Sequence, residues 1–183
     1  MFAIVSRARG CCRGSRPSAL SLAGLTAAAL LLGACTTMQQ IPAGTPLSEV
    51  QARYGAPTHS CTLPDGQRRL IWSMQPLGQY AWATTVGPDE RVGAVEQILS
   101  NAAFAEVKQG EWDHERLACM FGPPAEVSQV GLPSVRQEVW SYRYKQAGAW
   151  NSLMHIYFSE DGRVTRLHPG PDPFYEPIEI ISR

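Results

Sequence analysis

The sequence predicts an α+β protein made of two tandem αβββ repeats, with short helices packed on antiparallel sheets. Each half of the chain contains a segment of helical periodicity that ends in the pattern Gly-x-Pro, first at Gly55 and Pro57 and again at Gly122 and Pro124. Each segment is followed by several runs with the period of a strand. These signals recur in the same order at spacings of 67 to 72 residues, which predicts two copies of one module.

The two predicted helices are bounded by residues with capping roles. In the first half Thr45 is the expected N-cap and Pro46 takes the first helical position. In the second half Asp113 is the expected N-cap. Gly55 and Gly122 are placed to end the helices in a left-handed conformation, and the prolines that follow prevent the helices from resuming.

Strand-period runs follow each helix. In the first half they are 59–63, 69–74 and 80–86, with 92–99 as a candidate fourth; in the second half they are 126–130, 137–145, 152–159 and 163–168. The Pro-Asp-Gly turn at 64–66 predicts a hairpin between the first two runs. One more short helix is expected at 101–108, before the second repeat.

The first 34 residues have the layout of a secretory signal. Residues 1–18 contain four arginines and no acidic residue, and residues 19–34 are uncharged and rich in Leu and Ala. This apolar run is shorter than the roughly 20 residues that a helix needs to cross a bilayer, which disfavours a retained membrane span. We therefore expect a signal peptide over 1–34.

Cys35 directly follows Leu32, Gly33 and Ala34, and this tetrapeptide resembles the lipobox of bacterial lipoproteins. The resemblance implies that Cys35 becomes the first residue of the mature chain and carries acyl chains such as palmitate. Several acyl chains make a stable anchor, because each buried CH₂ contributes about 0.8 kcal/mol. Thr36 stands where an Asp would resemble an inner-membrane retention signal, so we expect the protein on the periplasmic face of the outer membrane.

These signals divide the chain into a signal peptide (1–34), a tether (35–43), a first repeat (44–100), a second repeat (101–176) and a C-terminal tail (177–183). Removal of the signal leaves twelve basic and sixteen acidic residues, so the mature net charge is 12 − 16 = −4. The mature chain has no basic patch or tail of the kind that nucleic-acid binding requires. We expect no nucleic-acid partner.

Two cysteines of the mature chain remain besides Cys35. Cys61 and Cys119 form an even pair, and an exported protein meets an oxidising compartment in which disulfides persist. A bridge would close a loop of more than fifty residues, which the chain-entropy model values at roughly 4 kcal/mol. The alternative is two separate buried thiols, and the sequence leaves both possibilities open.

The second half contains the turn Asp161-Gly162-Arg163-Val164, and each half has a tryptophan in its second strand run, Trp72 and Trp140. With the lipobox and the capped helices that end in Gly-x-Pro, these residues resemble the SmpA/OmlA (BamE-like) family of small outer-membrane lipoproteins. The family has one such module, whereas this chain has two, an arrangement similar to that of the β-lactamase inhibitor protein fold. The first half has Glu90 where the turn glycine would stand. The resemblance implies an αβββ fold and the barrel-assembly machinery as a partner.

No pattern in the mature chain predicts catalysis, a cofactor or a metal site. Its four histidines are far apart, and none has the spacing of a zinc site. No nucleophile elbow or phosphate-binding glycine loop is present either. His59 and Cys61 could act as base and nucleophile of an envelope hydrolase, but alternate residues of any strand share a face. We expect no enzymatic activity, and this hydrolase is the least favoured alternative.

Trp140, Tyr142 and Tyr144 alternate along one predicted strand and therefore share one face of the sheet. Tyr and Trp are enriched at binding hot spots, so the three are candidate partner contacts, with packing against the helices as the favoured alternative for any single one. We expect a lipid-anchored, non-catalytic protein-binding module that assists outer-membrane protein assembly or envelope maintenance. Its expected partners are the membrane and an envelope protein. The alternative function is an inhibitor or regulator of an envelope or secreted enzyme.

Overall fold

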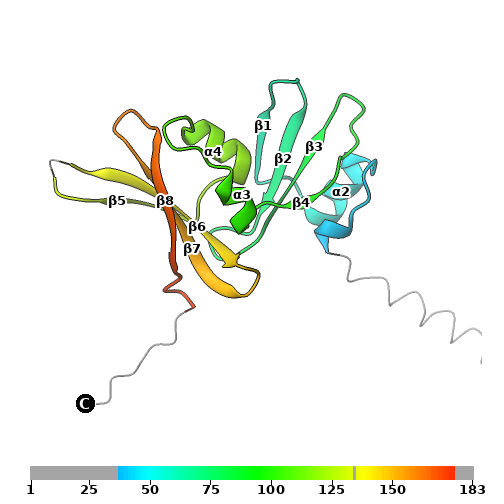
Figure 1. Cartoon of the computed structure of the whole chain (residues 1–183). Coiled ribbons are helices and arrows are strands. Elements are labelled where there is room, and N and C mark those ends of the chain that lie inside the picture. Colours follow the sequence, from blue (N-terminus) through cyan, green and yellow to red (C-terminus); the bar gives the residue numbers. More distant parts are fainter. Residues whose placement is uncertain (1–36, 134, 176–183) are drawn as a thin grey trace, which may run out of the picture. The chain divides into compact units, whose positions relative to one another are not determined.

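The computed structural model of the protein describes residues 37–133 and 135–175 (Figure 1). The helices are η1 (Met38–Gln40, a 3₁₀ turn), α2 (Leu47–Tyr54), α3 (Asn101–Ala105) and α4 (His114–Phe121). The strands are β1 (His59–Thr62), β2 (Arg68–Ser73), β3 (Ala81–Val86), β4 (Glu96–Gln97), β5 (Glu126–Val130), β6 (Gln137–Gln146), β7 (Trp150–Phe158) and β8 (Val164–Pro171). The predicted α+β class is confirmed. The predicted signal peptide, Cys35 and the tail 177–183 lie outside the described residues.

The strands form two antiparallel sheets, each ordered as its strands follow in the chain: β1-β2-β3-β4 and β5-β6-β7-β8. Each sheet has four strands, so the αβββ description, with three strands per half, is wrong, whereas the candidate fourth run at 92–99 and the fourth run of the second half at 163–168 both contain strands. The additional strand of the first sheet is the two-residue β4, which pairs with Trp82 and Ala83 of β3. In the second sheet β8 pairs with β7 from Phe158 back to Ser152, beyond the predicted end of the run at His168.

The first sheet is covered on both faces because its side chains alternate between two cores. Leu70 and Trp72 of β2 and Val86 of β3 point to one face, where they pack with Met38 of η1 and Val50 of α2. Because Met38 is buried, the packed structure begins at η1 and not at Gly44, where the predicted first repeat starts.

Helices α3 and α4 lie between the two sheets and supply the second core (Figure 1). Ile71 of the first sheet and Tyr142 of the second belong to the same buried cluster as Phe104 of α3 and Leu117 and Phe121 of α4. This cluster therefore joins both sheets into one hydrophobic core. Burial of each such side chain contributes about 1.5 to 3 kcal/mol to the stability of the fold. No helix among the described residues is long and apolar enough to span a membrane.

The ends of α4 follow the predicted capping chemistry. The Asp113 side chain accepts a hydrogen bond from the Arg116 backbone N–H at 2.9 Å, and Gly122 follows the helix with a φ of 79°. Only glycine adopts such a φ without strain, which explains why the helix ends there. At α2 the cap residue is Pro46, and Thr45 instead bonds the Pro42 carbonyl with its hydroxyl.

The loop between β2 and β3 contacts the second sheet through the amide side chain of Gln75. Its Nε2 donates to the Arg143 carbonyl at 2.8 Å, and its Oε1 accepts from the Arg143 N–H at 3.3 Å. The pairing of β5 with β6 has already ended at Ser141, so Arg143 has no strand beside it on that edge. The Gln75 side chain thus takes the place of a neighbouring strand and ties the first half to the second.

We expect Gln75→Ala to lower the free energy of unfolding by about 1 to 3 kcal/mol, because it leaves two backbone groups of Arg143 without partners. Chemical denaturation followed by circular dichroism measures this change. Gln75→Glu is the informative control: it retains the acceptor atoms but loses the donor, so its stability should fall as well. A Gln75→Ala chain as stable as the unchanged protein would contradict this role.

An ion pair links β6 with the segment after β8. The Arg143 Nε lies 3.1 Å from Asp172 Oδ2, although the angle between them is not that of a hydrogen bond. The Asp172 side chain is fully buried, and that of Arg143 is nearly so. Arg143 also donates to the Pro76 carbonyl at 2.7 Å and pairs with Glu126. The arginine therefore joins three segments that are far apart in the sequence.

Candidate partner-binding groove

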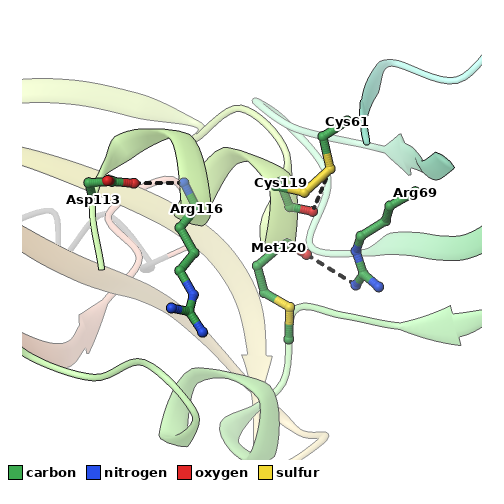
Figure 2. Close-up of a disulfide and its surroundings, with 6 residues drawn as sticks. All are labelled: Cys61, Arg69, Asp113, Arg116, Cys119 and Met120. Atoms are coloured by element: carbon green, nitrogen blue, oxygen red, sulfur yellow. Dashed lines mark hydrogen bonds between the residues drawn. A yellow bond between two sulfur atoms is a disulfide. The ribbon is translucent and has the colours of Figure 1, made fainter. Parts of the chain in front are cut away.

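Cys61 of β1 and Cys119 of α4 form a disulfide, with Cα atoms 5.6 Å apart (Figure 2). The structure thus has the bridge, one of the two possibilities that the sequence left open. A disulfide sulfur carries no hydrogen, so the 3.7 Å approach of Cys61 Sγ to the Cys119 carbonyl oxygen is a contact and not a hydrogen bond. The bridge holds the first strand of one half against the helix of the other.

A groove of about 1180 Å³ runs beside this disulfide. We call it the disulfide groove and define it by six of its lining residues: His59, Cys61, Arg69, Trp112, Arg116 and Met120. The first three come from β1 and β2, and the others come from α4 and the segment before it. Neither half alone could form the groove, because each half supplies only one wall.

Arg69 lies on the groove side of β2 because it pairs directly with Cys61 of β1. Its Nη2 donates to the Met120 carbonyl at 3.3 Å (Figure 2), while its Nε is buried without a hydrogen-bond partner among the described residues. Burial lowers the pKa of the Arg69 guanidinium, and the nearby Glu96 carboxylate raises it. Arg69 is therefore a partly desolvated cation with an unused donor.

The opposite wall carries a second cation on an aromatic ring. The Arg116 guanidinium lies 4.6 Å from the ring centroid of Trp112, a cation–π contact that holds the charge in place. Trp112 is buried, and its indole Nε1 also has no hydrogen-bond partner among the described residues. The groove thus contains two positioned cations, Arg69 and Arg116, which can pair with carboxylate or carbonyl oxygens. Lys108 and three acidic residues, Glu106, Asp113 and Glu115, also line it.

The proposed dyad of His59 and Cys61 cannot work as a thiol nucleophile in this structure. Both residues lie in β1 and line the disulfide groove, but the Cys61 sulfur is bonded to Cys119. Nucleophilic attack needs a thiolate, which a disulfide does not supply. Among the described residues, no three His, Cys, Asp or Glu side chains gather into a metal-ligating cluster.

The three aromatic residues expected at a partner surface face the core between the sheets. Tyr142 and Tyr144 are fully buried, and Tyr142 donates its hydroxyl hydrogen to the Gly122 carbonyl at 3.0 Å. Burial raises the pKa of both phenols. Trp140 is half-buried, and its Nε1 donates to Glu138 at 2.6 Å. The two tyrosines are therefore not partner contacts, and the favoured alternative of packing against the helices holds for them, because α3 and α4 cover this face.

Sequence reasoning missed Arg69, Arg116 and Trp112 as candidate binding residues. Arg69 is more than forty positions from Trp112 and Arg116, and no motif links it to them. The one available signal was the cysteine pair: a bridge between Cys61 and Cys119 places the residues around each cysteine side by side.

No protein-family profile matches this chain. No curated protein sequence matches it either. Two solved structures show a distant likeness. A DUF4309 family protein from Bacillus subtilis has 13% identity and a TM-score of 0.29, covering 68% of this chain and 77% of its own. A "putative beta-lactamase inhibitor protein" from Streptococcus mutans has 14% identity and a TM-score of 0.32, covering 74% and 88%. At these TM-scores the likenesses support no statement about activity or partner.

Proposed function

We propose that the mature protein is an outer-membrane lipoprotein anchored through Cys35, and that it acts as a non-catalytic protein-binding module on the periplasmic face. The lipobox and the charge pattern of the first 34 residues support the anchor. The proposal includes an origin of the two halves by duplication of one SmpA/OmlA-like module, supported by their shared order of a helix followed by four strands.

The disulfide groove is the observation that carries the binding function. Its walls come from both halves and are fixed by a covalent bridge, so a partner meets a surface that is already ordered. A preformed surface lowers the entropic cost of binding. Arginine and tryptophan are also the residues most often found at the energetic centre of interfaces.

The two arginines of the groove indicate what part of a partner would contact them. The exposed Arg116 cation would gain an ion pair from an oxygen of the partner, and the half-buried Arg69 adds a second positive charge, whereas the Nε of Arg69 and the Nε1 of Trp112 are buried and out of the partner's reach. A partner loop that presents a carboxylate side chain fits this pattern. In an assembly role this loop would belong to the barrel-assembly machinery, and in the alternative role it would belong to a regulated enzyme.

Affinity capture from detergent-solubilised envelopes tests the proposal. We expect Arg116→Glu to reduce the recovered partner roughly tenfold or more, because it places a like charge opposite the partner's carboxylate. Arg136→Glu is the matched control, since Arg136 is an exposed arginine between β5 and β6 and outside the groove. Recovery with this control should equal that of the unchanged chain.

The identity of the captured protein separates the two roles. Recovery of barrel-assembly components supports the assembly role, whereas recovery of one soluble enzyme supports the regulator. Equal recovery with Arg116→Glu and Arg136→Glu would overturn the assignment of the groove. Mass spectrometry of the mature N-terminus, with acyl chains expected on Cys35, tests the anchor separately.

A further inference from the structure

A second groove lies on the opposite face of the first sheet, between the sheet and α2. We call it the apolar groove; it has a volume of about 360 Å³ and is lined by Thr37, Met38, Tyr54, Trp72, Met74 and Trp82, with Ala56, Thr58 and Ser73 completing it. None of these nine residues is charged. This composition contrasts with that of the disulfide groove, which has arginines on both walls.

Met74 of this groove remains in contact with solvent, as do two large apolar side chains that follow it in the chain and are not among the lining residues, Leu77 and Tyr80. Met74 is 52% exposed, and Tyr80, at 38%, stacks on Trp82 with ring centroids 5.9 Å apart. Leu77, in the same loop, is 64% exposed. Trp72, by contrast, is buried, and its Nε1 donates to the Gly55 carbonyl at 2.9 Å. The groove therefore has a fixed aromatic floor and an apolar rim.

One residue that lines the apolar groove is close in the sequence to the proposed lipid anchor, and this proximity indicates which kind of ligand the groove meets. Thr37, which lines the groove, is only two residues beyond Cys35. Two residues span at most about 7 Å even when fully extended. If Cys35 carries the proposed lipid, the bilayer surface therefore begins within one or two side-chain lengths of this groove. The disulfide groove lies on the other face of the first sheet and is not brought to the membrane in this way.

We infer that the apolar groove binds an acyl chain of a bilayer phospholipid, an inference that rests on the proposed lipid anchor at Cys35. Trp and Tyr are the residues enriched at membrane interfaces, where an apolar ring body meets a polar rim. Each CH₂ that enters the groove contributes about 0.8 kcal/mol, and none of the lining residues imposes the cost of desolvating a charge.

Tryptophan quenching by brominated lipids tests this inference. The mature chain, as purified from detergent-solubilised membranes, is reconstituted into phosphatidylcholine vesicles whose acyl chains carry bromine atoms midway along their length. We expect these vesicles to quench the fluorescence of the unchanged protein, and Trp82→Phe to reduce the quenched share, with Trp72 of the groove floor accounting for the quenching that remains. Trp150→Phe is the matched control, because Trp150 is 74% exposed but lies in the second sheet; its quenched share should equal that of the unchanged protein.

A second pair of variants guards against a folding defect. Met74→Asp adds a charge to the groove at an exposed position and should reduce the quenching, while Leu132→Asp, at a position 70% exposed, should not. Circular dichroism checks that all variants are folded. Folded variants that are quenched to the same extent as the unchanged protein would overturn the inference. So would an unquenched Trp82, which is the result expected if the acyl chains of Cys35 itself filled the groove.

Flotation of the vesicles separates this inference from the proposed function. Protein that floats with the vesicles but shows no quenching of Trp82 retains its anchor and refutes the acyl-chain site alone. Protein that does not float has no lipid anchor, and both the localisation and the acyl-chain site are then wrong.

Discussion

Replacing Cys61 and Cys119 with serine together should lower the free energy of unfolding by about 4 kcal/mol. The bridge closes a loop between positions that are 58 residues apart, and in the chain-entropy model its removal gives that much conformational freedom back to the unfolded chain. The thermal midpoint should fall by roughly 10 °C, since about 1 kcal/mol corresponds to 2 to 4 °C in a domain of this size. Thermal unfolding followed by circular dichroism without reductant measures the effect.

Reductant supplies the internal control for this prediction. Dithiothreitol should lower the midpoint of the unchanged protein towards that of the double variant and leave the double variant unaffected. A variant with the same midpoint as the oxidised protein would mean that the bridge does not stabilise the fold. The partner capture described above should also weaken in this variant, because the two walls of the disulfide groove are then no longer linked.

The second large effect is expected from Asp172→Ala, which should lower the free energy of unfolding by about 3 to 5 kcal/mol. The substitution leaves the Arg143 guanidinium buried without the carboxylate that lies 3.1 Å from its Nε. Urea denaturation measures the loss. Glu160→Ala, a change at an exposed acidic residue, should alter stability by less than about 0.5 kcal/mol.

A double substitution separates the charge from the packing at this site. Arg143→Met combined with Asp172→Leu removes both charges of the buried pair and should regain part of the lost stability, because in the single variant only the half-exposed Glu126 carboxylate is left to pair with the buried Arg143 charge. If the double variant is less stable than Asp172→Ala, the contacts of Arg143 with Glu126 and the Pro76 carbonyl contribute more than the Asp172 pair.

Local chemistry allowed much of the fold to be predicted. The Asp113 cap, the glycines that follow both helices and the turn before β2 depend on neighbours in the chain, and the structure has each of them as expected. Strand β5 has the predicted bounds of 126–130. The start of α2 differs by one residue, since Pro46 caps the helix that it was expected to enter.

The sequence could not determine which face of each strand is covered, nor which helix or strand covers it. Tyr142 and Tyr144 have the alternation of a half-exposed strand, yet they are buried because helices from the middle of the chain pack on them. The disulfide groove could not be predicted for the same reason, because Arg69 and Arg116 come together only when α4 packs against β1. Such contacts depend on tertiary packing and leave no periodic signal in the sequence.

The position of α4 between the sheets has a consequence for how the protein is made. A chain is synthesised from its N-terminus, so the first sheet emerges before the helix that covers its inner face and before the cysteine that Cys61 needs. Until α4 arrives, the nascent protein carries a free thiol and an uncovered apolar surface around Ile71. Biogenesis of this protein therefore includes an interval in which chaperones and thiol oxidants can act on the first half alone.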